Sequence, residues 1–256
     1  MKCPKCGYVR TENDHYVMAG TCPACGIAYN KWQTDANQIN PSPDKNAIRL
    51  IEAGHVDNDL FKSPWCRLVS LLLYTPETVD RGTFWGRCMA YIFFLIWGLR
   101  FMINGMGWEA IGSSFMHNIN LPFHEFGHVL FRPFGHFMTI LGGSLFQVLL
   151  PLLLGQLFLV QHNNPFAASL MLWWCGQSFI DLSPYIADAT YRGLPLISGM
   201  GEESHDWGNL LTILGRLNHA YRIAQVSFAL GSCLMVLSFV WGAYLLNKQR
   251  KLLSDY

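Results

Sequence analysis

Five consecutive residues near the middle of the chain, His124-Glu125-Phe126-Gly127-His128, have the types and spacing of a zinc-binding motif. Two histidines four residues apart lie on one face of a helix, so both imidazoles can reach one Zn²⁺ ion. The glutamate can take a proton from a water molecule on the metal, whose pKa zinc lowers toward about 7. The motif lies in an apolar segment, where ionisable groups are costly and indicate function. The pattern predicts a catalytic zinc ion held by His124 and His128, with Glu125 as the base.

Two histidines leave a catalytic zinc ion short of one protein ligand, so a third is expected elsewhere in the chain. Asp188 is the preferred candidate, because Pro184 can end or kink a helix and turn Asp188 back toward a helix bundle. A later cluster, residues 202–206, fits a ligand or a partner of one, but it also fits a solvated loop in which Asp206 caps the next helix. The other candidates for a ligand or supporting role are Asp181, Glu202, Glu203, His205 and Asp206.

Two cysteine pairs near the start of the chain, Cys3 with Cys6 and Cys22 with Cys25, form a second candidate metal site. Two C-x-x-C turns about 15 residues apart have the spacing of a four-cysteine zinc site. A region this short cannot bury enough apolar surface to fold alone, so a metal would supply most of its folding free energy. We therefore expect residues 1–33 to form a zinc ribbon around one structural Zn²⁺. The ribbon could also dock an unknown protein partner.

The rest of the chain is unusually apolar. Of 256 residues, 51% are hydrophobic and only 14% are charged, whereas soluble domains carry about 25% charged residues. Polar residues gather in the first 65 positions, and no apolar signal-peptide core is visible there, so we expect the ribbon to be cytoplasmic. The net charge of +1 does not favour nucleic-acid binding. We predict an all-α membrane protein, a bundle of four to six transmembrane helices, with ribbon 1–33, linker 34–63 and membrane domain 64–256.

Several apolar runs are long enough to be considered as membrane spans. The shorter run at 64–74 better fits a helix that lies at the membrane interface. Within one run, Gly142-Gly143-Ser144 lowers helical propensity, so residues 137–143 are expected to be a re-entrant or extended piece. The expected spans are residues 84–103, 114–134, a helix that ends at 160, 166–180 and 223–246.

The basic residues leave the number of crossings open. Arg81 and Arg87 place the start of the first span inside, and Lys248, Arg250 and Lys251 follow the last span. An odd number of spans would put that basic end outside, against the positive-inside rule. Either one run does not cross, or another segment does.

Three features together resemble the site-2 protease family of intramembrane zinc metallopeptidases. They are an HExxH motif on an early span, a Gly-Gly segment after it, and a later span in which Pro184 precedes Asp188. The resemblance covers about residues 110–195, and Asp181 stands where the family carries Asn. It implies these roles: zinc ligands His124, His128 and Asp188, and the base Glu125.

These observations predict an intramembrane zinc endopeptidase that hydrolyses peptide bonds of membrane proteins or peptides. Residues 142–143 could offer a backbone edge on which an extended substrate pairs as a strand. Two alternatives stay open. One is a membrane zincin of the prenyl-protease type, with Glu202 or Glu203 as third ligand. The other is a catalytically inactive membrane scaffold or binding protein, although a base such as Glu125 has no purpose in a purely structural metal site.

Overall fold

The computed structural model describes residues 2–28 apart from 4, 12–13 and 15–16, and residues 64–253 apart from 77 and 196–203. The chain divides into two compact units, Met1–Leu60 and Phe61–Tyr256. The expected linker at 34–63 lies outside the described residues, as do Glu202 and Glu203.

In the first unit, each cysteine pair opens the same tight turn. The backbone N–H of Cys3 donates to Tyr8 at 2.7 Å, and that of Cys22 donates to Ile27 at 2.9 Å. The glycine after each pair has a positive φ, 77° in the first turn and 70° in the second. Glycine adopts this conformation without steric cost, which lets both cysteines of a pair face the same way.

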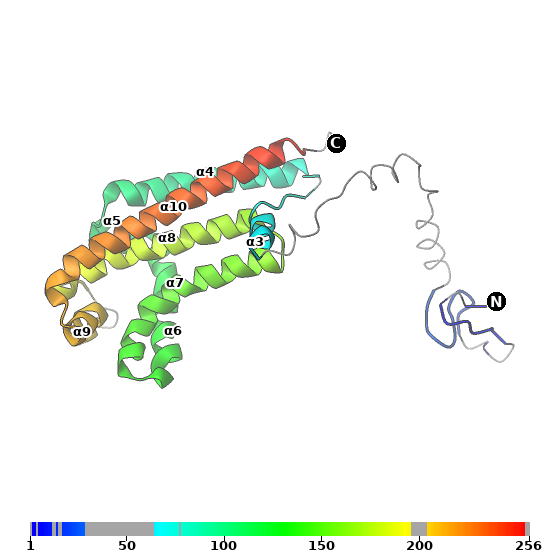
Figure 1. The fold of residues 1–256 in the computed structure, drawn as a ribbon, viewed down its shortest axis with the longest axis horizontal. Helices are drawn as coiled ribbons and strands as arrows, with labels where there is room; N and C mark the ends of the chain where they lie inside the picture. Colours follow the sequence, from blue (N-terminus) through cyan, green and yellow to red (C-terminus); the bar gives the residue numbers. More distant parts are fainter. Residues whose placement is uncertain are drawn as a thin grey trace. The chain divides into compact units, whose positions relative to one another are not determined.

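The second unit is built of helices. Among the described residues, β-structure is limited to isolated bridges. Figure 1 shows these helices in order along the chain. In chain order they are α3 (Pro64–Leu72), α4 (Arg81–Asn104), α5 (Trp108–Gly112), α6 (Phe115–Phe131), η3 (Arg132–Phe134), α7 (His136–Val160), α8 (Pro165–Ala187), η4 (Asp188–Thr190), α9 (Asp206–Ile213), η7 (Leu217–His219) and α10 (Ala220–Arg250).

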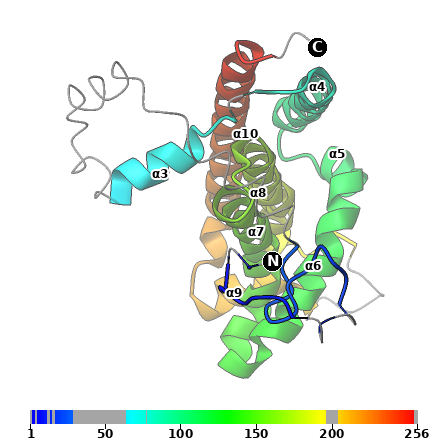
Figure 2. The same cartoon turned by 90° about the vertical axis from the view of Figure 1, so that its right-hand side faces the viewer.

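Helix α8 forms the centre of the bundle. Figures 1 and 2 show α8 and α7 between α10 on one side and α6 on the other. Trp173 and Ile180 of α8 and Met235 of α10 are fully buried together. The two helix backbones approach closely, since a Cβ added at Gly176 would lie 2.7 Å from the carbonyl oxygen of Gly231. Small residues at such crossings are typical of helix packing in membranes.

Three helical segments are long and apolar enough to cross a membrane: Arg81–Asn104, His136–Val160 and Leu217–Arg250. Large apolar side chains stand exposed along the first and last of them, among them Ile96 at 64% and Val240 at 64%. Exposed apolar surface on this scale suits a lipid environment. The architecture is therefore compatible with an integral membrane protein.

The expected set of spans changes in two ways. Among the described residues three helices meet the length and apolarity of a span, rather than four to six. Helix α6 has only 17 residues, and α8 carries buried polar side chains, including Gln177 and Asp181. In addition, the re-entrant piece expected at 137–143 is wrong, because α7 runs unbroken from His136 to Val160.

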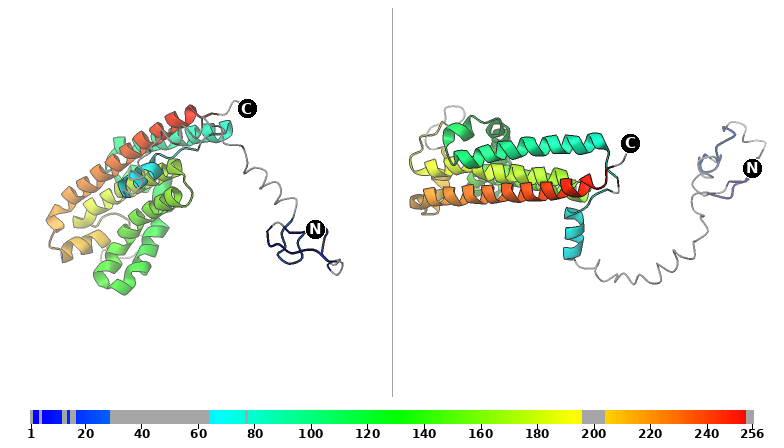
Figure 3. Two further views of the ribbon diagram at one scale, coloured as in Figure 1. Left: turned by 45° about the vertical axis from the view of Figure 1, so that its right-hand side comes forward. Right: turned by 90° about the horizontal axis from the view of Figure 1, so that it is seen from above.

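Helix α3 runs across the direction of the long helices, as Figure 3 shows from above. It is joined to α10 by two hydrogen bonds, from the Trp241 indole to Leu72 at 2.9 Å and from the Lys248 ammonium to Leu73 at 2.9 Å. Both acceptors are backbone carbonyls at the C-terminal end of α3, where a helix has unsatisfied oxygens. Its exposed Trp65 and Leu68 agree with a helix lying at a membrane interface.

Candidate metal centre

Helix α6 places two imidazoles side by side. Its N-cap Ser114 accepts a hydrogen bond from the backbone of His117, which fixes the start of the helix. Two turns further on, His124 and His128 lie on one face, with ring centroids 4.9 Å apart and the rings edge to face. Helical spacing alone accounts for this pair, as the sequence predicted.

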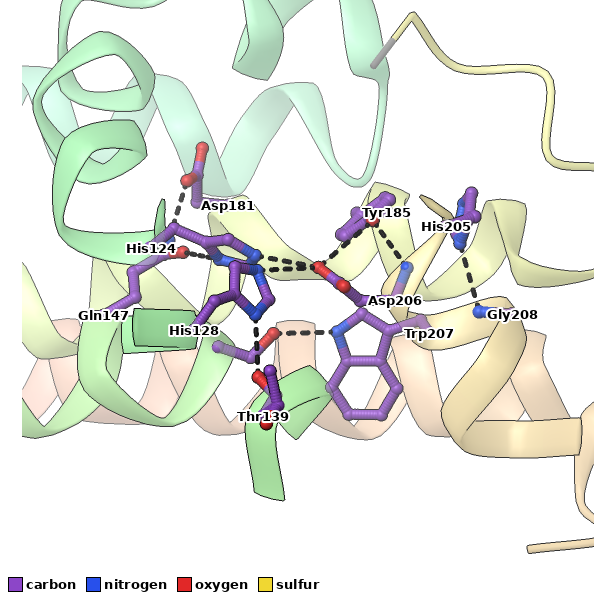
Figure 4. Close-up of polar contacts among 11 residues, drawn as sticks. His124, His128, Thr139, Gln147, Asp181, Tyr185, His205, Asp206, Trp207 and Gly208 are labelled. Atoms are coloured by element: carbon purple, nitrogen blue, oxygen red, sulfur yellow. Dashed lines mark hydrogen bonds and ion pairs between the residues drawn. The ribbon is translucent and has the colours of Figure 1, made fainter. Parts of the chain in front are cut away.

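The carboxylate that meets these imidazoles is that of Asp206, the first residue of α9. Its Oδ2 lies 3.0 Å from Nε2 of His124 and 3.3 Å from Nε2 of His128. Figure 4 shows both rings converging on this oxygen. Burial raises the pKa of the Asp206 carboxyl, but hydrogen bonds and charge from the two histidines outweigh it and lower the pKa to about 2. Asp206 is therefore ionised, as a metal ligand must be.

The donor set fits zinc. Two imidazole nitrogens and one carboxylate oxygen lie within 4.8 Å of one another. Tetrahedral ligands at about 2.1 Å from a zinc ion are separated by about 3.4 Å, so the distances of 3.0 and 3.3 Å from Asp206 to the two imidazoles need only small shifts. Three protein ligands also leave a fourth position open, which is typical of catalytic rather than structural zinc.

Each imidazole is oriented by a contact at its other nitrogen. Nδ1 of His128 lies 2.8 Å from the carbonyl oxygen of Thr139, which can only accept, so Nδ1 carries the proton. Nδ1 of His124 lies 3.0 Å from Oε1 of Gln147. Helix α7 can pass this close to the rings because of Gly143, where an added Cβ would lie 2.6 Å from Nε2 of both histidines. The glycines expected as a helix break instead permit close helix packing.

The three donor atoms face a cavity of about 760 Å³. Glu125 is exposed and also lines this cavity. Tyr185 of α8 lines it from another side, and its hydroxyl accepts from the backbone N–H of Asp206 at 2.9 Å and lies 3.4 Å from Oδ2 of Asp206. Glu125, three side chains that could hold a metal ion, and a cavity thus adjoin one another.

Asp188, the residue expected as third ligand, does not belong to this triad. Its carboxylate accepts hydrogen bonds from the backbone N–H groups of Gly193 at 3.1 Å and Leu194 at 2.9 Å, and it lies 3.3 Å from Nε2 of His205. The helix does not turn back at Pro184, since α8 continues to Ala187 and Asp188 follows as its C-cap. The structure brings Asp206 to the two histidines in its place.

The remaining candidates take supporting positions. His205 is fully buried, and its Nδ1 accepts from the backbone N–H of Gly208 at 3.0 Å, so it caps α9. Asp181 is also buried and lies 3.0 Å from Nδ1 of His117 and 2.8 Å from Nε2 of Gln147. Neither side chain is a member of the triad: His205 precedes Asp206 in the chain, and Asp181 contacts Gln147, which in turn contacts His124.

Sequence reasoning missed Gln147 and Tyr185. A single glutamine within an apolar run and a single tyrosine beside a proline have no motif that would single them out. For Asp206 a signal was present, since it opens the helix after an acidic cluster.

The four cysteines of the first unit form a separate cluster. Their sulfur atoms lie within 4.8 Å of one another, with Cys3 to Cys25 at 3.7 Å and Cys6 to Cys22 at 3.6 Å. Four sulfurs this close could hold a metal ion, and they leave no open position.

Comparison of the chain with protein-family models, with curated proteins and with solved structures gave no match.

Proposed function

We propose that this protein is an integral membrane zinc endopeptidase that hydrolyses peptide bonds of membrane proteins or membrane-associated peptides. The observation that carries the proposal is the convergence of His124, His128 and Asp206 on a cavity that Glu125 also lines. A base beside an open metal position is the arrangement that hydrolysis requires and that a structural site does not.

The chain's own groups divide the chemistry between them. Zinc, when bound, activates a water molecule and polarises the substrate carbonyl. Glu125 accepts a proton from the attacking water as its oxygen joins the carbonyl carbon. Glu125 then delivers that proton to the amide nitrogen as the C–N bond breaks, so one water is consumed for each bond cut. The Tyr185 hydroxyl, through its contacts with Asp206, holds the third ligand in place.

Two other functions would be compatible with a zinc motif in a membrane protein, and particular residues favour the endopeptidase over each of them. A zincin of the prenyl-protease type would take Glu202 or Glu203, which lie outside the described residues, as third ligand. The closeness of the Asp206 carboxylate to both histidines favours the endopeptidase proposed here. An inactive scaffold would have no use for the exposed Glu125 beside the triad. We also propose that the four-cysteine cluster holds a structural zinc ion, which its closed donor set supports.

The test combines metal counting with proteolysis. The purified protein in detergent should contain two zinc ions per chain and cleave an internally quenched peptide mixture. Glu125→Gln should retain both ions and lower kcat/KM by at least about 100-fold, because it removes the general base. Glu109→Gln, an exposed glutamate on α5, is the matched control and should leave activity unchanged.

Two results would contradict the proposal. The first is a single zinc ion that disappears when the four ribbon cysteines are changed to serine, which would favour the scaffold. The second is proteolysis that survives Glu125→Gln undiminished.

A further inference from the structure

One buried glutamine links the metal centre to a carboxylate on another helix. Oε1 of Gln147, on α7, lies 3.0 Å from Nδ1 of His124 on α6. Its Nε2 lies 2.8 Å from Oδ2 of Asp181 on α8. The glutamine is 3% exposed and the aspartate 5%, so water has little access to either. The polar chain His124–Gln147–Asp181 can be followed in Figure 4.

The direction of the Gln147 amide is set by Asp181. A carboxylate only accepts hydrogen bonds, so the NH₂ group of the amide must face it. The amide oxygen therefore faces His124, and since that oxygen only accepts, Nδ1 of His124 must carry a proton. With its proton on Nδ1, the ring is left to bind a metal through Nε2, which is the nitrogen beside Asp206.

Asp181 is itself held from α6. Its Oδ2 accepts from Nδ2 of Asn120 at 3.1 Å, and its Oδ1 lies 3.0 Å from Nδ1 of His117. Asn120 in turn donates to Oε1 of Gln177 at 2.7 Å. Both oxygens of the carboxylate are thus engaged, and it cannot rotate away from Gln147 without breaking contacts on two helices.

We propose that Gln147 is a positioning residue that fixes the proton of His124 on Nδ1, and that Asp181 fixes the direction of the Gln147 amide. This inference rests on the proposed function, because it assigns a purpose to the network only if His124 binds zinc. An amide suits this place better than a carboxylate, since it orients the ring without adding a negative charge beside the ligand.

The experiment uses the full chain with Cys3, Cys6, Cys22 and Cys25 changed to serine, so that zinc in the first unit does not obscure the second. Zinc affinity is measured by competition with a chelating dye for Gln147→Met, which has similar bulk but no amide. The matched control is Gln177→Met, a fully buried glutamine that accepts a hydrogen bond from Asn120 rather than facing His124. Thermal unfolding of both variants is followed in parallel.

We expect Gln147→Met to weaken zinc binding about 10–100-fold, the usual effect of removing a partner of a metal-bound histidine. Gln177→Met should leave zinc affinity within about threefold of the parent, even where it lowers Tm as much.

A second readout reports the ring proton itself. With Co²⁺ in place of zinc, proton NMR should show a strongly shifted, exchangeable signal for the Nδ1 proton of each bound histidine. One of the two signals should be lost or exchange rapidly with solvent in Gln147→Met, and both should persist in Gln177→Met.

The outcomes separate the two proposals. If the four-serine parent binds no zinc at His124, the proposed function fails. If the parent binds zinc but Gln147→Met does so equally well, or no worse than Gln177→Met, only the positioning role is overturned.

Discussion

Asp206 is proposed as the third zinc ligand because it is the aspartate that lies beside the two imidazoles. Asp206 lies within 3.3 Å of both Nε2 atoms, whereas Asp188 is engaged by backbone N–H groups and His205. We expect Asp206→Ala to reduce zinc at the centre to a trace and to abolish proteolysis, because two neutral histidines alone bind zinc weakly. Asp188→Ala should retain a full equivalent of zinc at saturating metal. Zinc content after dialysis at defined free zinc measures both.

The reverse result would restore the ligand set implied by the site-2 protease resemblance. Equal zinc in the Asp206→Ala protein and the parent, with loss in Asp188→Ala, would show that the centre rearranges when metal binds.

At the scale of residues, sequence reasoning worked where the geometry is local. His124, Glu125 and His128 are neighbours on one helix, so their spacing alone fixes their relation. Asp206 reaches them from 82 positions beyond His124, and the packing of α9 against α7, α8 and η4 brings it there. From the sequence alone, Asp188 after Pro184 and Asp206 before a helix are both candidates for the third ligand. Only the tertiary contacts distinguish them.

At the scale of elements, α9 carries the proposed third ligand, so its N-terminus must be held firmly. The N-cap His205 accepts from Gly208 and is itself bound to Asp188 at 3.3 Å. We expect His205→Ala to lower zinc affinity, since loss of an N-cap costs about 1 kcal/mol, or about a fivefold change in binding. Hydrogen exchange of the α9 amides should rise in the same variant, because the first turn loses its acceptor.

The matched control for this effect is Asp80→Ala. Asp80 caps α4 by accepting from the backbone N–H of Thr83 at 2.9 Å, remote from the metal centre. It should destabilise its own helix to a similar degree and leave zinc affinity unchanged. Equal loss of zinc affinity in the two variants would mean that α9 acts only through global stability.

The elements themselves were predictable in part. Long apolar runs identified α4, α7 and α10, since length and hydropathy suffice for a candidate span. Helix propensity predicted a break at Gly142 and Gly143, but the helix continues there. Tertiary packing outweighs the cost of glycine in a helix, and only glycine leaves room for α7 to pass this close to His124. Helix α8 is less apolar than the candidate spans because it carries polar side chains that are buried in the bundle interior.

At the scale of the whole molecule, the structure bears on the number of crossings. Val79, before α4, pairs with Leu253, after α10, and its N–H donates to Leu252 at 3.0 Å. Arg87 near the start of α4 donates to Gln249 near the end of α10 at 2.9 Å. The start of α4 and the end of α10 therefore lie together, which requires an even number of crossings between them. We propose that α8, which returns after the short α7–α8 connection, is a fourth crossing beside α4, α7 and α10, although it is less apolar than these three.

This arrangement predicts sidedness. Basic residues gather at the shared end, so the positive-inside rule puts that end in the cytoplasm: Arg81, Arg87, Lys248, Arg250 and Lys251. In a background whose native cysteines are serine, His162→Cys should resist a membrane-impermeant thiol reagent added to intact cells. His219→Cys, the matched histidine at the other end, should react. Both positions are exposed, so differing reactivity reports the side of the membrane rather than burial. Labelling of both variants from outside would mean that the two positions lie on the same side of the membrane, and the four-crossing arrangement would be wrong. Labelling of His162→Cys alone would keep the four crossings but place the basic end outside the cell.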